Sequence, residues 1–299
     1  MKKKIKKVPF QKHNQEQKFR VTSVNTLLPF LMETFKDKSR SAVKSYLAHR
    51  QIAINGRVST AFDATLHLGD EVSFRLLGEQ TPNPNHKVRI VFEDNDLIIV
   101  DKKPGVLTMS TGLEGEQTAY SIMMEHVRRH RKTDRVYIVH RLDRETSGLL
   151  LLAKSEEAQA RLQEDWNKTV IERRYIAVVE GKLDQTNGTI RSWLTDNLKS
   201  MKVSSSTTDN GGKEAITHYK TIRSGEKYSL VELNLETGRK NQIRVHMANL
   251  GHPVAGDKKY GATSNPLKRI CLHAQTLSFY HPFTGEAMKF DTGIPPQFL

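Results

Sequence analysis

Hydrophobic positions along the chain divide it into two parts with different patterns. Residues 19–80 predict two short helices, the first around LLPFLMETF, followed by strands. In IAINGRV, the pair Asn55-Gly56 stands between apolar residues. This is the strongest short-range hairpin signal, because both central residues of a type I′ turn need positive φ. We therefore expect a small α+β domain in this part of the chain.

Strands dominate the pattern further along the chain. TPNPNHK, residues 81–87, contains two prolines and no hydrophobic periodicity, which predicts a linker. Beyond it, LIIVDKK, GLLLLAKS, RRYIAVVEG, YSLVELNLE and CLHAQTLSFY are typical of strands, whereas residues 118–130 and QIRVHMANLG predict helices. Residues 88–299 therefore predict a second α+β domain, built on a mixed, largely antiparallel sheet.

The composition excludes several classes of protein. Hydrophobic residues make up 37% of the chain, and no apolar run approaches the length of a membrane span, about 20 residues. Cys271 is the only cysteine, which excludes an intramolecular disulfide framework and any multi-cysteine metal site. The start, MKKKIKKVPF, lacks the apolar stretch of a secretion signal. We expect a protein that resides in the cytoplasm and does not enter the membrane.

The charge points to a polyanionic partner. The formal net charge is +14, and residues 1–19 carry seven lysines against the single acidic residue Glu16. We therefore interpret residues 1–18 as a disordered basic tail. Blocks of like charge usually stay solvated and bind polyanions, and a phosphate backbone is the commonest such partner. A tail that only improves solubility is the alternative.

One polar loop concentrates groups that can carry chemistry. In HRLDRETSGLLLLAKS, residues 140–155, the side chains of His140, Arg141, Asp143 and Thr146 directly precede an apolar strand. A carboxylate on a loop whose ends are fixed by strands can be aimed at a ligand accurately. Taken alone, the loop is equally compatible with an Asp143 that only stabilises a turn.

Other motifs predict little. His126 and His130 have the i, i+4 spacing of two helical metal ligands, but HVRRH lacks the glutamate of HExxH and lies among arginines and lysines. We predict no metal site. Neither the dinucleotide-binding pattern GxGxxG nor the phosphate-binding pattern GxxxxGK[ST] occurs, which argues against enzymes that use those nucleotides.

The polar loop and three later segments together resemble a known family. HRLDRETSGLLLLAK is similar to the signature of the RluA-type RNA pseudouridine synthases. The similarity continues in ERRYIAVVEG, LETGRKNQIRVHMANLGHPVAGDKKYG and CLHAQTLSFYHPFTGE, and it covers residues 88–290. Asn241 stands where the family usually has the histidine of GRxHQIR. Residues 19–80 resemble the RNA-binding module of a small-subunit ribosomal protein, here called the S-four-like domain, which many members carry.

The resemblance implies an isomerase that converts uridine in RNA to pseudouridine without a cofactor. Asp143 aligns with the essential aspartate, which either attacks the anomeric carbon or removes a ribose proton. Arg244 aligns with the arginine that pairs with this aspartate, and a guanidinium can hold a carboxylate in a fixed orientation. Tyr175 aligns with the tyrosine that stacks on the target uracil. Ribosomal RNA is the favoured substrate, and transfer RNA is the alternative.

Further contacts follow from the same resemblance. We predict substrate contacts for His140, Arg141, Thr146, Arg239, Ile270 and Leu272, and RNA contacts in the front domain for Arg40, Lys44 and Arg50. Arg141 would either fill the space that a flipped nucleotide leaves or contact the phosphate of that nucleotide, because an enzyme cannot reach the glycosidic bond of a stacked base. We expect a monomer. The competing hypothesis is a non-catalytic RNA-binding or ribosome-binding protein on the same fold.

Overall fold

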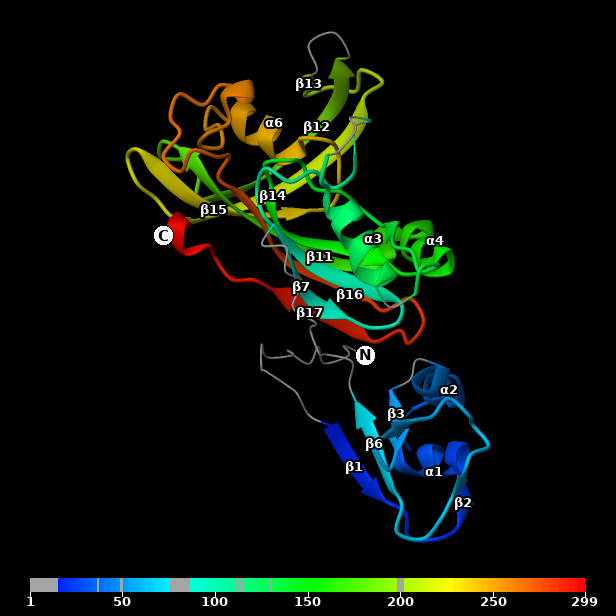
Figure 1. The fold of residues 1–299 in the computed structure, drawn as a ribbon. Coiled ribbons are helices and arrows are strands. Elements are labelled where there is room, and N and C mark those ends of the chain that lie inside the picture. Colours follow the sequence, from blue (N-terminus) through cyan, green and yellow to red (C-terminus); the bar gives the residue numbers. More distant parts are fainter. Residues whose placement is uncertain are drawn as a thin grey trace. The chain divides into compact units, whose positions relative to one another are not determined.

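The chain divides into two compact units. The computed structural model describes residues 16–36, 38–48, 51–75, 87–110, 112, 116–129, 131–197 and 202–299. One unit contains the described residues up to 75 together with the turn at 92–95, and the other contains the remaining described residues from Lys87 on (Figure 1). Most of the predicted linker lies outside the described residues, so the domain boundaries given above stay predictions.

The front unit is a small four-stranded sheet covered by two helices. Its strands have the order β1-β6-β3-β4, and a two-stranded pair β2-β5 lies beside them. The bounds are β1 Glu16–Arg20, β2 Asn25–Thr26, α1 Leu27–Thr34, α2 Arg40–Ala48, β3 Ile52–Ile54, β4 Arg57–Val58, β5 Thr65–Leu66 and β6 Glu71–Arg75. The helices pack on the sheet through buried Leu27, Leu31, Val43 and Ile52.

Two features of the front unit test the sequence-based expectations. Asn55 and Gly56 have φ values of +48° and +77°, and they connect β3 to β4, so the predicted hairpin turn is confirmed. Strand β1, however, begins at Glu16, inside the segment that we interpreted as a disordered tail. It pairs antiparallel with β6, more than fifty residues later. The lysine-rich composition hid this strand, because its pairing partner is distant in sequence.

The second unit is built on an eleven-stranded sheet. Nine strands follow the order β13-β12-β14-β15-β11-β16-β10-β8-β7, while β17 pairs with β16 and β9 with β10. The bounds are β7 Val88–Glu93, β8 Leu97–Lys102, β9 Tyr137–Ile138, β10 Ser147–Ala153, β11 Val170–Glu180, β12 Asn187–Asn197, β13 Lys202–Ser206, β14 Lys213–Arg223, β15 Tyr228–Leu235, β16 Leu272–Tyr280 and β17 Ala287–Asp291. Strands β10 and β16 are parallel, whereas β11, β12, β14 and β15 form an antiparallel run. The predicted mixed, largely antiparallel sheet is confirmed.

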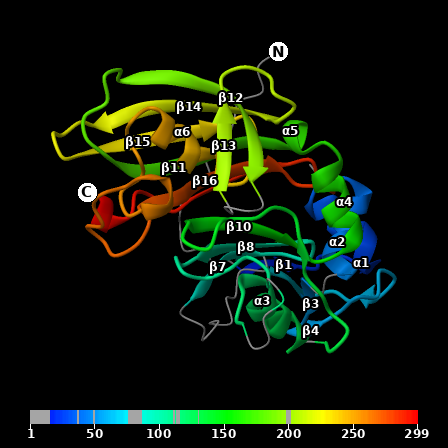
Figure 2. The ribbon, with the colours of Figure 1, turned by 90° about the horizontal axis from the view of Figure 1, so that it is seen from above.

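Helices cover parts of this sheet. Their bounds are α3 Ala119–Arg128, α4 Glu156–Glu164, α5 Trp166–Thr169 and α6 Gln242–Asn249, with short 3-10 turns η1 Lys258–Tyr260 and η2 Pro296–Phe298. Helix α3 packs through Met123 against strands β8 and β10, and α6 packs through Val245 near β12 and β13 (Figure 2). Among the described residues, no helix is both long and apolar enough to cross a membrane.

The hydrophobic pattern predicts α3 and α6 but does not reveal α4, β12 or β13. The polar stretch SSSTTDNGG, residues 204–212, has the composition of a loop, yet residues 204–206 belong to strand β13. Both missed strands are rich in serine, threonine and other polar residues, and they are strands because each finds a partner: β12 pairs with β14, and β13 pairs with β12. Polar strands of this kind give no clear hydrophobic alternation.

Gly148 allows the two parallel strands to meet directly after the polar loop. It has a φ of +111° and pairs with Ala274 of β16. A Cβ atom added at Gly148 would lie 2.1 Å from the carbonyl oxygen of Ala274. Only glycine adopts this conformation and leaves that space open. The contact fixes the end of the loop that precedes β10.

Candidate active site

The polar loop between β9 and β10 forms one wall of a cleft. Arg141, Asp143 and Thr146 line it from this loop. Leu142 lines it from the same loop, and the other walls come from Tyr175, Leu235, Arg239, residues 241–244 and Leu272. The structure thus brings together, from separate segments of the chain, most of the side chains that the family resemblance selected.

Arg244 is the centre of the charged groups in the cleft. Its Nε and Nη2 atoms donate to the two carboxylate oxygens of Asp257, at 2.6 and 2.8 Å. Its Nη1 atom lies 3.4 Å from Oδ2 of Asp143. Charge-assisted bonds of this type are usually about 2.7–2.9 Å long, so the two-pronged pair is with Asp257. Asp143 receives one longer contact.

Burial keeps this arrangement rigid. The Arg244 side chain is 10% exposed, and that of Asp257 is 0% exposed. Burial by itself lowers the pKa of Arg244, but the hydrogen bonds and charge of Asp257, together with those of Asp143, outweigh it and raise the pKa above the usual value. The guanidinium therefore remains a fixed cation beside Asp143.

Asn241 extends the same network. It has a left-handed backbone, with φ of +54°, directly before α6. Its Oδ1 accepts a hydrogen bond from Nη1 of Arg244 at 3.1 Å, and its Nδ2 donates to the hydroxyl of Tyr260 at 2.9 Å. The Tyr260 ring lies 5.0 Å from the Arg244 guanidinium. The neutral amide therefore holds both the arginine and η1 through hydrogen bonds, with no titrating group at this position.

Tyr175 reaches the cleft from β11. The pairing of β11 with β16 shifts register between Arg174 and Tyr175, and such irregularities re-aim side chains. The ring packs against both main apolar clusters of the unit. Burial raises the pKa of Tyr175; Arg173 opposes this rise and Asp143 adds to it. At neutral pH the phenol is therefore protonated and can act as a hydrogen-bond donor.

Comparison with known proteins identifies the family. The family described as RNA pseudouridylate synthase matches residues 96–249. The chain belongs to this family. It is 35% identical to the uncharacterized RNA pseudouridine synthase YhcT of Bacillus subtilis, over 89% of this chain and 88% of the relative. It is 31% identical to the ribosomal large subunit pseudouridine synthase D of Escherichia coli K12, over 89% and 86%. These findings favour the isomerase over the non-catalytic binding protein.

Solved structures agree with this assignment. The human RNA pseudouridylate synthase domain containing 1 is 26% identical and has a TM-score of 0.56, covering 71% of this synthase and 84% of that chain. The human RNA pseudouridylate synthase domain containing 4 has a TM-score of 0.58 at 23% identity, covering 70% and 89%; this second likeness shows the shared fold alone.

Of the other residues predicted to contact the substrate, four line the cleft and Ile270 does not. Thr146 and Leu272 are each 3% exposed in the cleft wall, and Arg141 is exposed at its rim. Arg239 also lines the cleft, and its Nε donates to the carbonyl of Glu214 at 2.9 Å. Ile270 instead belongs to the neighbouring apolar cluster.

His140 lies outside the set of residues that line the cleft. Its Nε2 accepts a hydrogen bond from the backbone N–H of Leu151 at 3.0 Å, and its ring lies 5.3 Å from that of Trp166. Burial, with the charge of Arg173, lowers the pKa of His140 to about 3. The histidine therefore stays neutral and attaches the start of the loop to β10.

The predicted residues of the front unit can be placed in part. Arg40 and Lys44 are exposed on α2, one turn apart, and Lys44 lies 6.0 Å from the ring of Phe62. Arg50 lies outside the described residues. The same holds for His130. His126, the other histidine of the i, i+4 pair, is a buried residue of α3.

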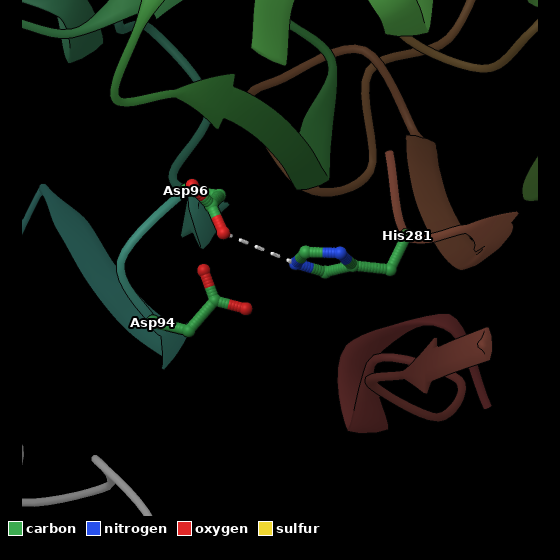
Figure 3. A group of neighbouring side chains, drawn as sticks. All are labelled: Asp94, Asp96 and His281. Carbon is green, nitrogen blue, oxygen red and sulfur yellow. Dashed lines mark ion pairs between the residues drawn. The ribbon is translucent and has the colours of Figure 1, made fainter. Parts of the chain in front are cut away.

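A histidine–carboxylate contact occurs away from the cleft. Nε2 of His281 lies 3.8 Å from Oδ2 of Asp96 (Figure 3). Nδ1 of His281 accepts the backbone N–H groups of Phe283 and Thr284 at 3.3 and 3.2 Å. One ring nitrogen therefore contacts the backbone of the following turn while the other faces Asp96, and these contacts hold the turn after β16.

Sequence patterns alone do not mark four residues that support the cleft, namely Asp257, Tyr260, Lys102 and Thr108. Asp257 and Tyr260 lie in the GDKKY part of a segment that we quoted, but no local pattern distinguishes an orienting carboxylate from an ordinary turn residue. Lys102 and Thr108 lie at the end of β8 and just beyond it, and they contact the polar loop 34 or more residues later. Only the tertiary structure reveals these contacts.

Proposed function

We propose that this synthase converts uridine to pseudouridine in ribosomal RNA of the large subunit, with Asp143 as the catalytic carboxylate. The observation that carries the role of Asp143 is its position in the cleft. It faces Arg244, which buried Asp257 orients, and it shares the cleft with Tyr175. Relatives named ribosomal large subunit pseudouridine synthase D support the choice of RNA.

The reaction breaks the bond between the ribose C1′ and uracil N1 and forms a bond between C1′ and uracil C5. Asp143 either attacks C1′ or removes a ribose proton to release the base. Both routes need a carboxylate anion, and the Arg244 guanidinium supplies the opposite charge beside it. The uracil then rotates and C5 joins C1′; on the first route this displaces the Asp143 carboxylate from C1′, and on the second Asp143 returns the proton to the ribose. The C5 proton is lost while N1 gains a proton.

Tyr175 and the apolar wall would hold the base during this rotation. A flat ring can stack on uracil, and Leu272 supplies an apolar surface in the same cleft. The phenol keeps its proton at neutral pH because burial raises its pKa. Tyr175 can therefore stack on the base as a neutral phenol.

Recognition of the RNA would use both units. A target base must leave its stack, which costs a few kcal/mol, and exposed Arg141 at the rim of the cleft can fill the space it leaves. Arg40 and Lys44 on α2 would contact phosphates, as expected of an S-four-like domain. We propose that the synthase acts as a monomer in the cytoplasm without a cofactor.

Asp143→Asn in the full-length protein tests the central claim. The amide keeps the shape of the side chain and loses its charge, so tritium release from RNA carrying 5-tritiated uridine should cease while RNA affinity stays within about threefold. Asp165→Asn, at a partly exposed position paired with Lys168, is the matched control and should remain fully active. Substantial tritium release by the Asp143 variant would exclude the proposed role.

The choice of RNA needs a separate experiment. Large-subunit ribosomal RNA, small-subunit ribosomal RNA and transfer RNA from cells that lack the gene would each be incubated with the protein, and pseudouridines would be mapped. A new pseudouridine in large-subunit RNA is the expected result. Modification of transfer RNA alone would replace the proposed substrate and leave the role of Asp143 intact.

A further inference from the structure

Thr108 forms hydrogen bonds with both the N–H and the carbonyl group of Leu142, the residue before Asp143. Its Oγ1 donates to the carbonyl of Leu142 at 2.8 Å and accepts the N–H of Leu142 at 3.1 Å. Thr108 is 2% exposed and Leu142 is 4% exposed. One hydroxyl thus satisfies a donor and an acceptor of the same buried residue, which fixes the orientation of the peptide groups on either side of Leu142, including the one that joins it to Asp143.

Lys102 holds the residue after Asp143. Its ammonium group donates to the carbonyl of Arg144 at 3.1 Å, and to those of Val106 and Lys103 at 2.7 and 3.2 Å. The N–H of Gly105 donates to the same Arg144 carbonyl at 2.9 Å. Lys102 is 0% exposed, so its amino group is held inside the protein by these three carbonyls, and burial lowers its pKa to about 7.

These contacts enclose Asp143 from one continuous segment, residues 102–108. The peptide group between Leu142 and Asp143 and the one that follows Arg144 cannot rotate without breaking them, and a buried polar group left unpaired costs about 1–3 kcal/mol. Neither Lys102 nor Thr108 is among the residues that line the cleft. Their contacts reach the reaction only through the backbone of the loop.

We propose that Thr108 and Lys102 are positioning residues for the isomerisation, because they hold the backbone at Leu142 and Arg144 so that the Asp143 carboxylate points into the cleft. This proposal rests on the proposed role of Asp143. A displacement of about 1 Å at a reacting group can cost about 100-fold in rate. Loss of either residue therefore slows turnover and leaves RNA binding unchanged.

Thr108→Val in the full-length protein is the direct test, because valine keeps the shape and removes the hydroxyl. At saturating RNA, the single-turnover rate should fall about 10- to 100-fold while the Kd for RNA changes by less than about threefold. Thr108→Ser keeps the hydroxyl and should restore the rate to within about threefold of wild type. A residue needed only for packing would not show this rescue.

Thr276→Val is the matched control. Thr276 is 2% exposed on β16, and its Oγ1 donates to Asp291 at 2.6 Å, away from the cleft. This variant should lower the Tm about as much as Thr108→Val and keep the wild-type rate. Lys102→Gln is a second variant for the case that Thr108→Val does not fold. It retains a hydrogen-bond donor but not the amino group of lysine, and it should lower kcat and leave KM unchanged.

The outcomes separate this proposal from the proposed function. A wild-type rate for a folded Thr108→Val or Lys102→Gln protein would overturn the positioning role, as would an equal loss of rate in Thr276→Val. Continued turnover by Asp143→Asn would instead overturn the proposed function. An inactive Asp143→Asn protein with a slowed Thr108→Val protein and an active Thr108→Ser protein is the result that supports both.

Discussion

Arg244 gives its two-pronged ion pair to Asp257 and only one longer contact, of 3.4 Å, to Asp143. Asp257 has no exposed side-chain surface, so the acid that orients the guanidinium is not the acid that faces the cleft. Asp143 therefore meets a cation whose position is already fixed. It remains able to change its own contacts during a reaction.

Replacement of Asp257 should disturb both stability and turnover. In Asp257→Asn the buried guanidinium loses its charged partner, and removing one member of a buried pair costs about 3–5 kcal/mol. Urea unfolding should show that loss, and turnover should fall at least tenfold because Arg244 loses its orientation. The control Asp196→Asn breaks the exposed pair with Lys240 and should cost less than about 1 kcal/mol. Equal stability in the two variants would contradict the orienting role.

Gly148→Ala should be among the most disruptive small substitutions in the chain. The added Cβ would lie 2.1 Å from a backbone oxygen of Ala274, and the φ of +111° is unfavourable for alanine. Gly261→Ala is a matched control, since it has a φ of +97° and no atom within 4 Å of an added Cβ. The control should lose about 1–2 kcal/mol from the backbone alone. Unfolding in urea should show a clearly larger loss for Gly148→Ala, and similar losses would refute the close contact.

The stability of the protein should fall in mild acid. Burial lowers the pKa values of His246 and His273 to about 4, below the ordinary value of 6.5. Between these values the unfolded chain binds protons that the folded chain does not, so unfolding becomes easier as the pH falls from about 6.5 towards 4. Each histidine contributes at most about 1.4 kcal/mol per pH unit.

Urea unfolding at pH 7.5, 6.0 and 5.0 measures this dependence. His246 hydrogen-bonds to Ser192 and Thr217, both at 2.9 Å, and an amide can replace it there. His246→Gln should therefore fold and show a smaller loss of stability between pH 6 and 5 than the wild type. A free energy of unfolding that stays constant over this range would contradict the prediction.

Neutralising the cations of α2 should weaken RNA binding without slowing the chemistry. Arg40→Gln and Lys44→Gln should each reduce the slope of log K against log salt by about 0.7–0.9, because each variant removes one cation that neutralises a phosphate. The single-turnover rate at saturating RNA should stay unchanged, because such cations stabilise the ground state and the transition state equally. Lys36→Gln, also exposed in the front unit but outside α2, is the control. An unchanged salt slope in both variants would exclude α2 as an RNA-binding element.

The sequence by itself determined features that depend on local pattern. Asn55-Gly56 predicted a turn with two positive φ values because that requirement belongs to the two residues themselves. Apolar strands such as β8, β10 and β11 were predicted because their burial shows in their composition. The chemistry of the polar loop and the family were predicted from contiguous motifs, and the family match confirms the latter.

Other features were decided only by the tertiary structure, because their cause is a partner far along the chain. β1 is a strand because β6 pairs with it, and polar β12 is a strand because β14 does. His140 belongs to the predicted loop but bonds to β10, away from the cleft. The hydrogen bonds that enclose Asp143 join residues 34 and 42 positions apart. Hydrophobic periodicity reports which face of an element is buried, but the burial of a polar side chain and its partner depend on how the elements meet.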